Sequence, residues 1–77
     1  MYTEEMSKAF QSIKAPENFK VTIYDNEEFV TMVIDPEDIE NLLDNQVDDA
    51  VQYINDVKKA LEELGAIVYI VREALKD

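Results

Sequence analysis

Hydrophobic residues recur in the first half of the chain at spacings that predict one helix and two strands. Residues 3–14 place their apolar side chains at helical intervals, and Thr3 stands where an N-cap is expected. Residues 19–24 alternate between apolar and polar side chains, and residues 29–34 form a β-branched apolar run, so both predict strands. The four residues between them, 25–28, fit a hairpin loop.

The next segment begins with the clearest helix signal in the chain. Asp35 suits an N-cap, and Pro36 suits the first helical position. Apolar residues then recur every three or four positions, which would fit one helix over residues 36–64. Such a helix would be about 43 Å long and would overhang a six-residue strand of about 20 Å.

A break near the middle of this segment removes the overhang. Asn45 offers a second N-cap, and Asp48 would then lie in the next first turn. We therefore expect two helices, over residues 36–44 and 46–64, with Gly65 as the residue that follows the second helix.

Residues 66–71 are apolar at every position and predict a third strand. The element order is then α-β-β-α-α-β, an α+β domain on a three-stranded sheet. The third strand could lie antiparallel beside the first or parallel beside the second. Its apolar pattern favours a central position, yet a tight hairpin would pair the first two strands directly. Helices on both faces, a partner at an edge, or a homodimer through the sheet would each resolve this conflict.

The amino-acid composition excludes several classes of function. The 77 residues form one acidic domain, residues 1–77, with 47% apolar residues, which is a folding composition. Cysteine and histidine are absent, so disulfides, Cys-ligated zinc and a histidine general base are excluded. The formal net charge of −11 argues against direct nucleic-acid binding and against docking on an anionic membrane.

We expect no enzyme, no cofactor and no metal site. One glycine cannot supply a phosphate-binding loop, and the serines have no histidine to activate them. The oxygen-rich residues 44–49 fail the calcium-loop pattern, which needs a glycine at its sixth position. The first residues lack the features of a secretory signal and the longest apolar run has six residues, so the expected setting is cytoplasmic.

Charge is distributed unevenly along the chain. Residues 21–57 contain eleven acidic residues and no basic one, whereas the remaining forty residues contain seven of each. One interpretation is a solvated surface, because helix first turns and loops favour acids without any further role. The other is a surface that binds a basic partner. Glu40, Asp44 and Asp48 are spaced by four, and on a continuous helix they would form a mutually repelling ladder.

The density of acids supports the second interpretation. Seven acids in residues 36–56 would extend over about 31 Å if helical, and one DNA strand carries about nine phosphates over that length. The candidate partner-binding residues are Glu37, Glu40, Asp44, Asp48, Asp49 and Asp56.

In size, acidity and lack of Cys and His, the chain resembles the small phage-encoded DNA-mimic inhibitors. The resemblance covers composition and charge clustering, and no motif is matched residue by residue. It implies a protein in the host cytoplasm that inhibits a basic, nucleic-acid-binding protein through its acidic surface. Residues 57–71, helix, glycine and strand, also resemble part of the barstar-type ribonuclease inhibitors, whereas the N-terminal half does not fit them.

Two other functions remain open at this point. One is an antitoxin-like or regulatory binder whose basic partner does not bind nucleic acid. The other is an acidic structural or assembly module with no inhibitory role. Competition with DNA separates the first from a mimic, and sedimentation would reveal the second as a homodimer.

Overall fold

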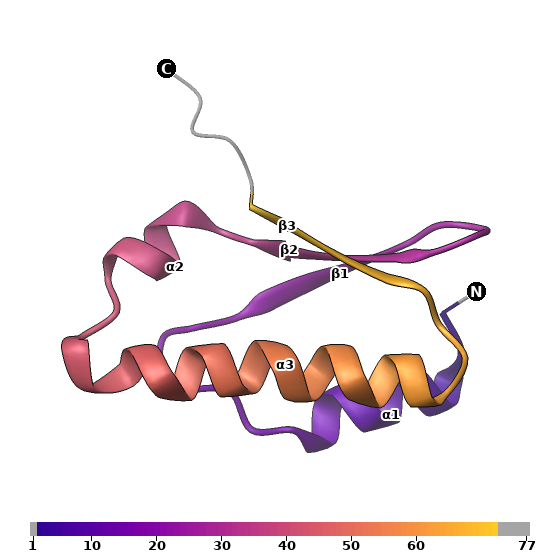
Figure 1. The fold of residues 1–77 in the computed structure, drawn as a ribbon, viewed down its shortest axis with the longest axis horizontal. Coiled ribbons are helices and arrows are strands. Elements are labelled where there is room, and N and C mark those ends of the chain that lie inside the picture. The colour runs from indigo at the N-terminus through magenta and orange to yellow at the C-terminus, as the bar shows by residue number, and fades with distance from the viewer. Residues whose placement is uncertain (1, 73–77) are drawn as a thin grey trace.

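The structure is a computed structural model that describes residues 2–72. It confirms an α+β domain with the expected order of elements and a three-stranded mixed sheet (Figure 1). The elements are α1 (Glu4–Ser12), β1 (Val21–Asp25), β2 (Val30–Ile34), α2 (Pro36–Glu40), the 3-10 helix η1 (Asp44–Gln46), α3 (Val47–Glu63) and β3 (Val68–Arg72).

Two of the predicted helix starts are confirmed by their capping contacts. The Thr3 hydroxyl oxygen accepts a hydrogen bond from the Met6 backbone N–H at 3.2 Å. The Asp35 carboxylate accepts one from the Glu37 backbone N–H at 2.9 Å, with Pro36 in the first turn. Each cap satisfies a backbone donor that the helix itself cannot pair.

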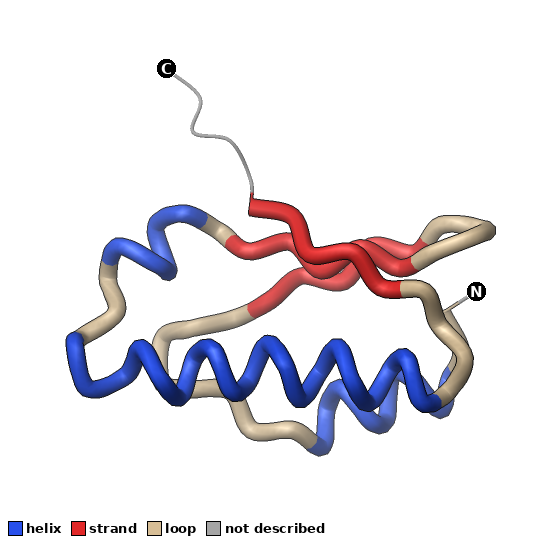
Figure 2. Tube along the Cα trace, in the orientation of Figure 1, coloured by secondary structure: helices blue, strands red, loops and turns tan. Residues whose placement is uncertain are grey.

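The expected break in the long helical segment is present, but it lies in a different place. The first helix ends at Glu40 instead of residue 44, and a loop separates it from η1 and α3 (Figure 2). Leu42 in this loop packs against the core, which turns the chain earlier than the periodicity predicts. Asn45 is not the cap; the Gln46 side-chain oxygen instead accepts the Leu43 backbone N–H at 3.1 Å.

α3 ends in a Schellman motif, as the position of its glycine predicts. The Ala66 N–H donates to the Leu61 carbonyl and the Gly65 N–H donates to the Glu62 carbonyl, both at 3.0 Å. Gly65 has φ +100°, a left-handed conformation that a residue with a Cβ rarely adopts.

β2 is the central strand, so the third strand does not take the central position that its apolar pattern favours; of the two placements left open, it takes the parallel one beside the second strand. β1 pairs antiparallel with β2, with Val21 opposite Ile34. β3 pairs parallel with the other side of β2, with Val30 opposite Val68, and is therefore an edge strand. The hairpin loop has the predicted four residues but lies one position later, at residues 26–29.

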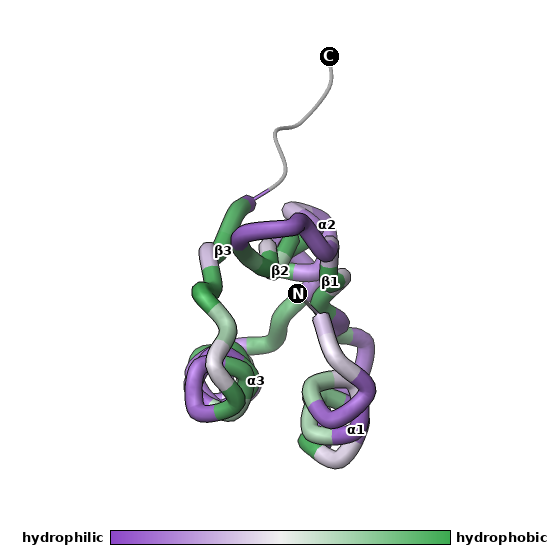
Figure 3. The backbone as a smooth tube through the Cα atoms, turned by 90° about the vertical axis from the view of Figure 1, so that its right-hand side faces the viewer, coloured by the Kyte–Doolittle hydropathy of each residue, from purple (hydrophilic) through white to green (hydrophobic). Residues whose placement is uncertain are grey.

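α1 and α3 lie side by side on one face of the sheet (Figure 3). The most deeply buried side chains, Met32, Leu61, Val30 and Val57, fill the space between this face and α3. No described helix covers the opposite face, so helices do not resolve the apolar pattern of β3. We call this side the open face; its strand residues are Thr22, Tyr24, Thr31, Val33, Tyr69 and Val71.

Candidate functional site

The six candidate acidic residues are all exposed, and five of them belong to three consecutive elements. Glu37 and Glu40 lie on α2, Asp44 on η1, and Asp48 and Asp49 on the first turn of α3. α2, η1 and the start of α3 lie together at one end of the molecule, on the left in Figure 1. We call this group the acidic end; its residues are Glu37, Glu40, Asp44, Asp48 and Asp49.

The break in the helical segment changes the local electrostatics. Glu40, Asp44 and Asp48 lie on three separate elements, so they do not form a ladder on one continuous helix. The N-terminal turn of a helix favours acids by about 0.3–1 kcal/mol each, which accounts for Asp48 and Asp49 on α3. Glu40 is the last residue of α2, where the helix dipole disfavours a negative charge.

The acidic end carries negative charge that the described residues leave uncompensated. None of its five carboxylates forms an ion pair with any residue between 2 and 72. In contrast, the Lys58 ammonium lies 3.5 Å from the Glu62 carboxylate further along α3, at the spacing of four that the sequence predicts. The five carboxylates of the acidic end are therefore exposed and form no ion pair within the described residues, although Lys20 lies near α2, where its backbone N–H donates to Asp38.

The acids of the hairpin loop do not join this surface. The loop with Glu27 and Glu28 projects from the opposite end of the sheet, on the right in Figure 1. The neighbouring Asp25 has a structural contact, because its carboxylate accepts the Tyr2 backbone N–H at 2.9 Å. This hydrogen bond lowers the pKa of Asp25. The acids of the hairpin loop therefore lie apart from the acidic end.

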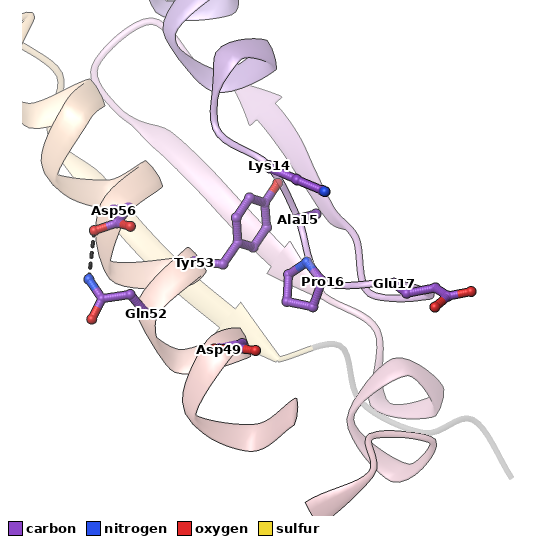
Figure 4. A pocket seen from close by; sticks show the side chains of 8 residues that line it. All are labelled: Lys14, Ala15, Pro16, Glu17, Asp49, Gln52, Tyr53 and Asp56. Atoms are coloured by element: carbon purple, nitrogen blue, oxygen red, sulfur yellow. Dashed lines mark hydrogen bonds between the residues drawn. The ribbon is translucent and has the colours of Figure 1, made fainter. Parts of the chain in front are cut away.

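A groove of about 440 Å³ runs beside the acidic end (Figure 4). We call it the α3 groove. One wall comes from α3, where positions spaced by three and four share a helix face, and the other from the loop after α1. Its residues are Asp49, Gln52, Tyr53 and Asp56 on α3, and Lys14, Ala15, Pro16 and Glu17 on the loop.

The floor of the α3 groove is apolar and its rim is mostly acidic. Tyr53 is 5% exposed, and its ring packs edge-on against Phe19 with the ring centroids 6.2 Å apart. Burial raises the pKa of the Tyr53 hydroxyl. Asp56 accepts a hydrogen bond from the Gln52 side-chain nitrogen at 2.8 Å. The groove thus brings Asp56 onto the same surface as Asp49, whereas the other four candidates do not line it: Glu37, Glu40, Asp44 and Asp48.

A second hollow, of about 560 Å³, contains none of the six candidate acids. It is lined by Asn18, Phe19, Lys20, Asp38 and Asn41. The Lys20 backbone N–H donates to the Asp38 carboxylate across it at 3.4 Å. Its acidic and basic side chains are balanced, so it does not extend the negative surface.

The loop wall of the α3 groove could not be found from the sequence. The spacing of Asp49, Tyr53 and Asp56 identifies one face of a helix. Lys14 and Glu17, however, reach this face only because the segment after α1 folds back against α3. No local pattern in residues 14–17 reports that long-range contact.

Within residues 2–72, no helix is long and apolar enough to cross a membrane, and no three acidic side chains are grouped so that they could hold a metal ion. Comparison of the chain with protein-family models, curated proteins and solved structures found no match.

Proposed function

We propose that this protein binds a basic, nucleic-acid-binding protein through its acidic end and inhibits it as a DNA mimic. The observation that carries the proposal is the grouping of five exposed carboxylates from α2, η1 and α3 at one end of the molecule. The described residues offer these carboxylates no ion pair, so a partner's lysines and arginines would be their first strong charge partners.

The physical mechanism is electrostatic. Carboxylates would take the place of phosphates and accept charge-assisted hydrogen bonds from lysine and arginine in the partner's nucleic-acid site. A net charge of −11 would also steer a basic partner toward the surface and speed association. Binding by such a surface weakens as salt rises, because salt screens exposed charges.

The α3 groove adds an apolar contact to this electrostatic surface. A lysine or arginine side chain has a charged head on an apolar stem. The stem would lie against Pro16 and the Tyr53 ring, while the head would reach Asp49 or Asp56 on the rim. This groove favours a protein partner over a simple counter-ion, because a free cation has no stem to place there.

The setting that goes with this function is the cytoplasm, where a nucleic-acid-binding partner would be found. The alternative, an antitoxin-like or regulatory binder, uses the same carboxylates on a partner that does not bind nucleic acid. The DNA-mimic proposal and this alternative differ only in whether the partner has a nucleic-acid-binding site that the acidic end occupies.

A pull-down from cell extract followed by mass spectrometry tests the proposal. The baits are the wild type, an acidic-end variant (Glu40→Gln, Asp44→Asn, Asp48→Asn and Asp49→Asn) and a matched control (Glu5→Gln, Glu27→Gln, Glu28→Gln and Glu63→Gln). Both variants remove four negative charges, but the control residues are exposed and lie outside the acidic end. We expect the wild type and the control to retain one nucleic-acid-binding protein that the acidic-end variant loses.

Competition then separates the two proposed modes of binding. Adding a DNA duplex or RNA that the captured protein binds should displace the wild type in proportion to the nucleic acid bound. If added nucleic acid leaves the amount of captured protein unchanged, the antitoxin-like or regulatory alternative is favoured. Equal loss of capture in both variants would show that net charge alone matters, and equal retention in both would remove the acidic end from the function.

A further inference from the structure

β3 is an edge strand with exposed apolar side chains on both faces of the sheet. Tyr69 and Val71 are 54% and 43% exposed on the open face, and Ile70 is 42% exposed on the helix face. The outer side of β3 also presents backbone N–H and C=O groups that no described strand pairs.

Among the residues that the structure describes, nothing gives this edge the usual protection against pairing. Natural edge strands are commonly shielded by lysine, proline, a bulge or a covering segment. From Gly65 to Val71 the chain has no charged residue and no proline, and Arg72 is the first charge. The other edge differs, because β1 ends at the charged Asp25, which is held by the Tyr2 backbone N–H.

We infer that β3 pairs antiparallel with β3 of a second copy of this chain, forming a continuous six-stranded sheet. The inference is independent of the function proposed above. A two-fold axis at the centre of the strand would place Ile70 opposite Ile70 of the second copy. Tyr69 would then lie opposite Val71 of the second copy, and cross-strand pairs of an aromatic with a β-branched residue are favourable.

The same register is complementary in charge. Arg72 would lie opposite Val68 of the second copy, at the end of the strand where α3 of that copy stops. The last turn of α3 carries Glu62 and Glu63, and the negative end of its helix dipole points there. Arg72, the first charged residue after the apolar segment, would therefore lie near negative charge on the second copy.

The pairing also keeps the acidic ends apart. β2 and β3 are parallel, so the C-terminal end of β3 lies at the same end of the sheet as the start of α2. Two antiparallel copies would place their acidic ends at opposite ends of the joined sheet. Both acidic ends would remain exposed, so dimerisation would not compete with binding of a basic partner there.

Edge pairing explains the exposed residues better than stacking of two open faces. Stacked faces would cover Tyr69 and Val71 but would leave Ile70 exposed, because it points to the helix side. A five-residue strand about 17 Å long presents less than the roughly 800 Å² per partner of a stable interface. We therefore expect a weak dimer that forms as protein concentration rises.

Sedimentation of the full chain between about 1 μM and 1 mM tests the inference, since weak association appears in that range. The mass should rise from 8.9 kDa toward twice that value, and the rise should be larger in high salt, because screening reduces repulsion between two copies of charge −11. Binding through the acidic end has the opposite salt dependence, so the two proposals can fail separately.

Matched lysine variants locate the contact. Ile70→Lys would place two like charges directly opposite each other and should weaken the dimer about tenfold or more. Tyr24→Lys adds the same charge on the open face of β1, where the wild-type side chain is 58% exposed, and should leave edge pairing unchanged.

A cross-linking measurement does not depend on how well the lysine variants fold. The chain has no cysteine, so one introduced thiol reports one position. Residues directly opposite in an antiparallel ladder have Cα atoms about 4.5–5.5 Å apart, within the range that a disulfide spans. Ile70→Cys should form a disulfide dimer under mild oxidation much faster than Tyr24→Cys.

Two results would overturn the inference. A wild type that stays at 8.9 kDa at every concentration and salt, with Ile70→Cys no faster than Tyr24→Cys, would leave the edge for a different partner. Faster cross-linking through Tyr24→Cys would assign the contact to the open face instead.

Discussion

At the residue scale, Tyr53 links the core to the α3 groove. Burial raises the pKa of its hydroxyl above 10.0, because the phenolate would lose solvation in the apolar floor. Burial of the neutral Tyr53 hydroxyl therefore stabilises the folded state below pH 10.0, which is the pKa of tyrosine in the unfolded chain. This stabilisation is lost as the pH rises through the higher pKa of Tyr53 in the folded protein. In an ultraviolet absorbance titration of the folded protein, the phenolate of Tyr53 should therefore form last.

The comparison uses Tyr53→Phe, which keeps the edge-on ring contact with Phe19. This variant should lose the late step of the titration, and its alkaline unfolding should move to higher pH. Tyr24→Phe removes an exposed hydroxyl and should leave the late step in place. A titration in which Tyr53→Phe removes an early step would contradict the assignment.

Asp35 shows how the role of an acid depends on its place. Its carboxylate accepts the Glu37 backbone N–H at 2.9 Å and caps α2, whereas Asp44 starts η1 without a hydrogen bond of this kind. Asp35→Ala should lower the free energy of unfolding by about 1 kcal/mol, and Asp44→Ala should change it by less than half of that. Urea denaturation of both variants measures the difference, and equal losses would mean that the cap contact contributes nothing specific.

At the element scale, short-range signals predicted two helix starts, the end of α3 and the strands, but not the end of α2 or the arrangement of the strands. Thr3, Asp35 and Gly65 act through contacts within a few residues, so the sequence alone located them. The early end of α2 depends on Leu42 reaching a core built by distant segments. The position of β3 stayed undecided because an edge strand that is apolar on both faces has the same pattern as a central strand.

The Schellman motif that joins α3 to β3 gives a test at this scale. Gly65 has φ +100°, and a Cβ placed there would meet nothing within 4 Å. The cost of Gly65→Ala is therefore backbone strain without a steric clash, and we expect a loss of about 1–2 kcal/mol. Thermal or urea unfolding measures it, with Glu63→Ala as an exposed control in the preceding turn. No loss in Gly65→Ala would show that the chain can leave the left-handed conformation at little cost.

At the scale of the whole molecule, the sequence identified the acidic residues but not how they divide in space. The segment over residues 21–57 is continuous in sequence, yet the fold sends its hairpin loop and its helices to opposite ends. The strand β2 crosses between them, so charges that are neighbours in sequence become separated by the length of the sheet. This division follows from β2, which lies between the hairpin loop and α2, and the count of acids along the segment does not show it.

Charge also sets how the stability of the whole molecule responds to salt. The principal extents are 33 × 29 × 14 Å, close to the screening length of about 30 Å at 0.01 M salt, which falls to about 10 Å at 0.1 M. The ion pairs of Lys8 with Glu4 and Lys58 with Glu62 span 3.8 Å and 3.5 Å, and exposed pairs of this kind contribute about 0.3–0.5 kcal/mol each. We expect the repulsion within a net charge of −11 to exceed this attraction, so sodium chloride should stabilise the fold.

We expect the midpoint of thermal unfolding to rise between 0.01 M and 0.5 M sodium chloride. A gain of about 1 kcal/mol corresponds to roughly 4–8 °C for a domain of this size. The acidic-end variant and its matched control each remove four negative charges, so the midpoint should rise less with salt in both. This comparison separates screening from the general strengthening of apolar burial by salt.

If only the acidic-end variant loses the salt dependence, the repulsion is local to α2, η1 and α3. A wild-type midpoint that falls with salt would mean that ion pairs and helix dipoles outweigh the repulsion. The acids would then be explained by folding stability, without need of a basic partner.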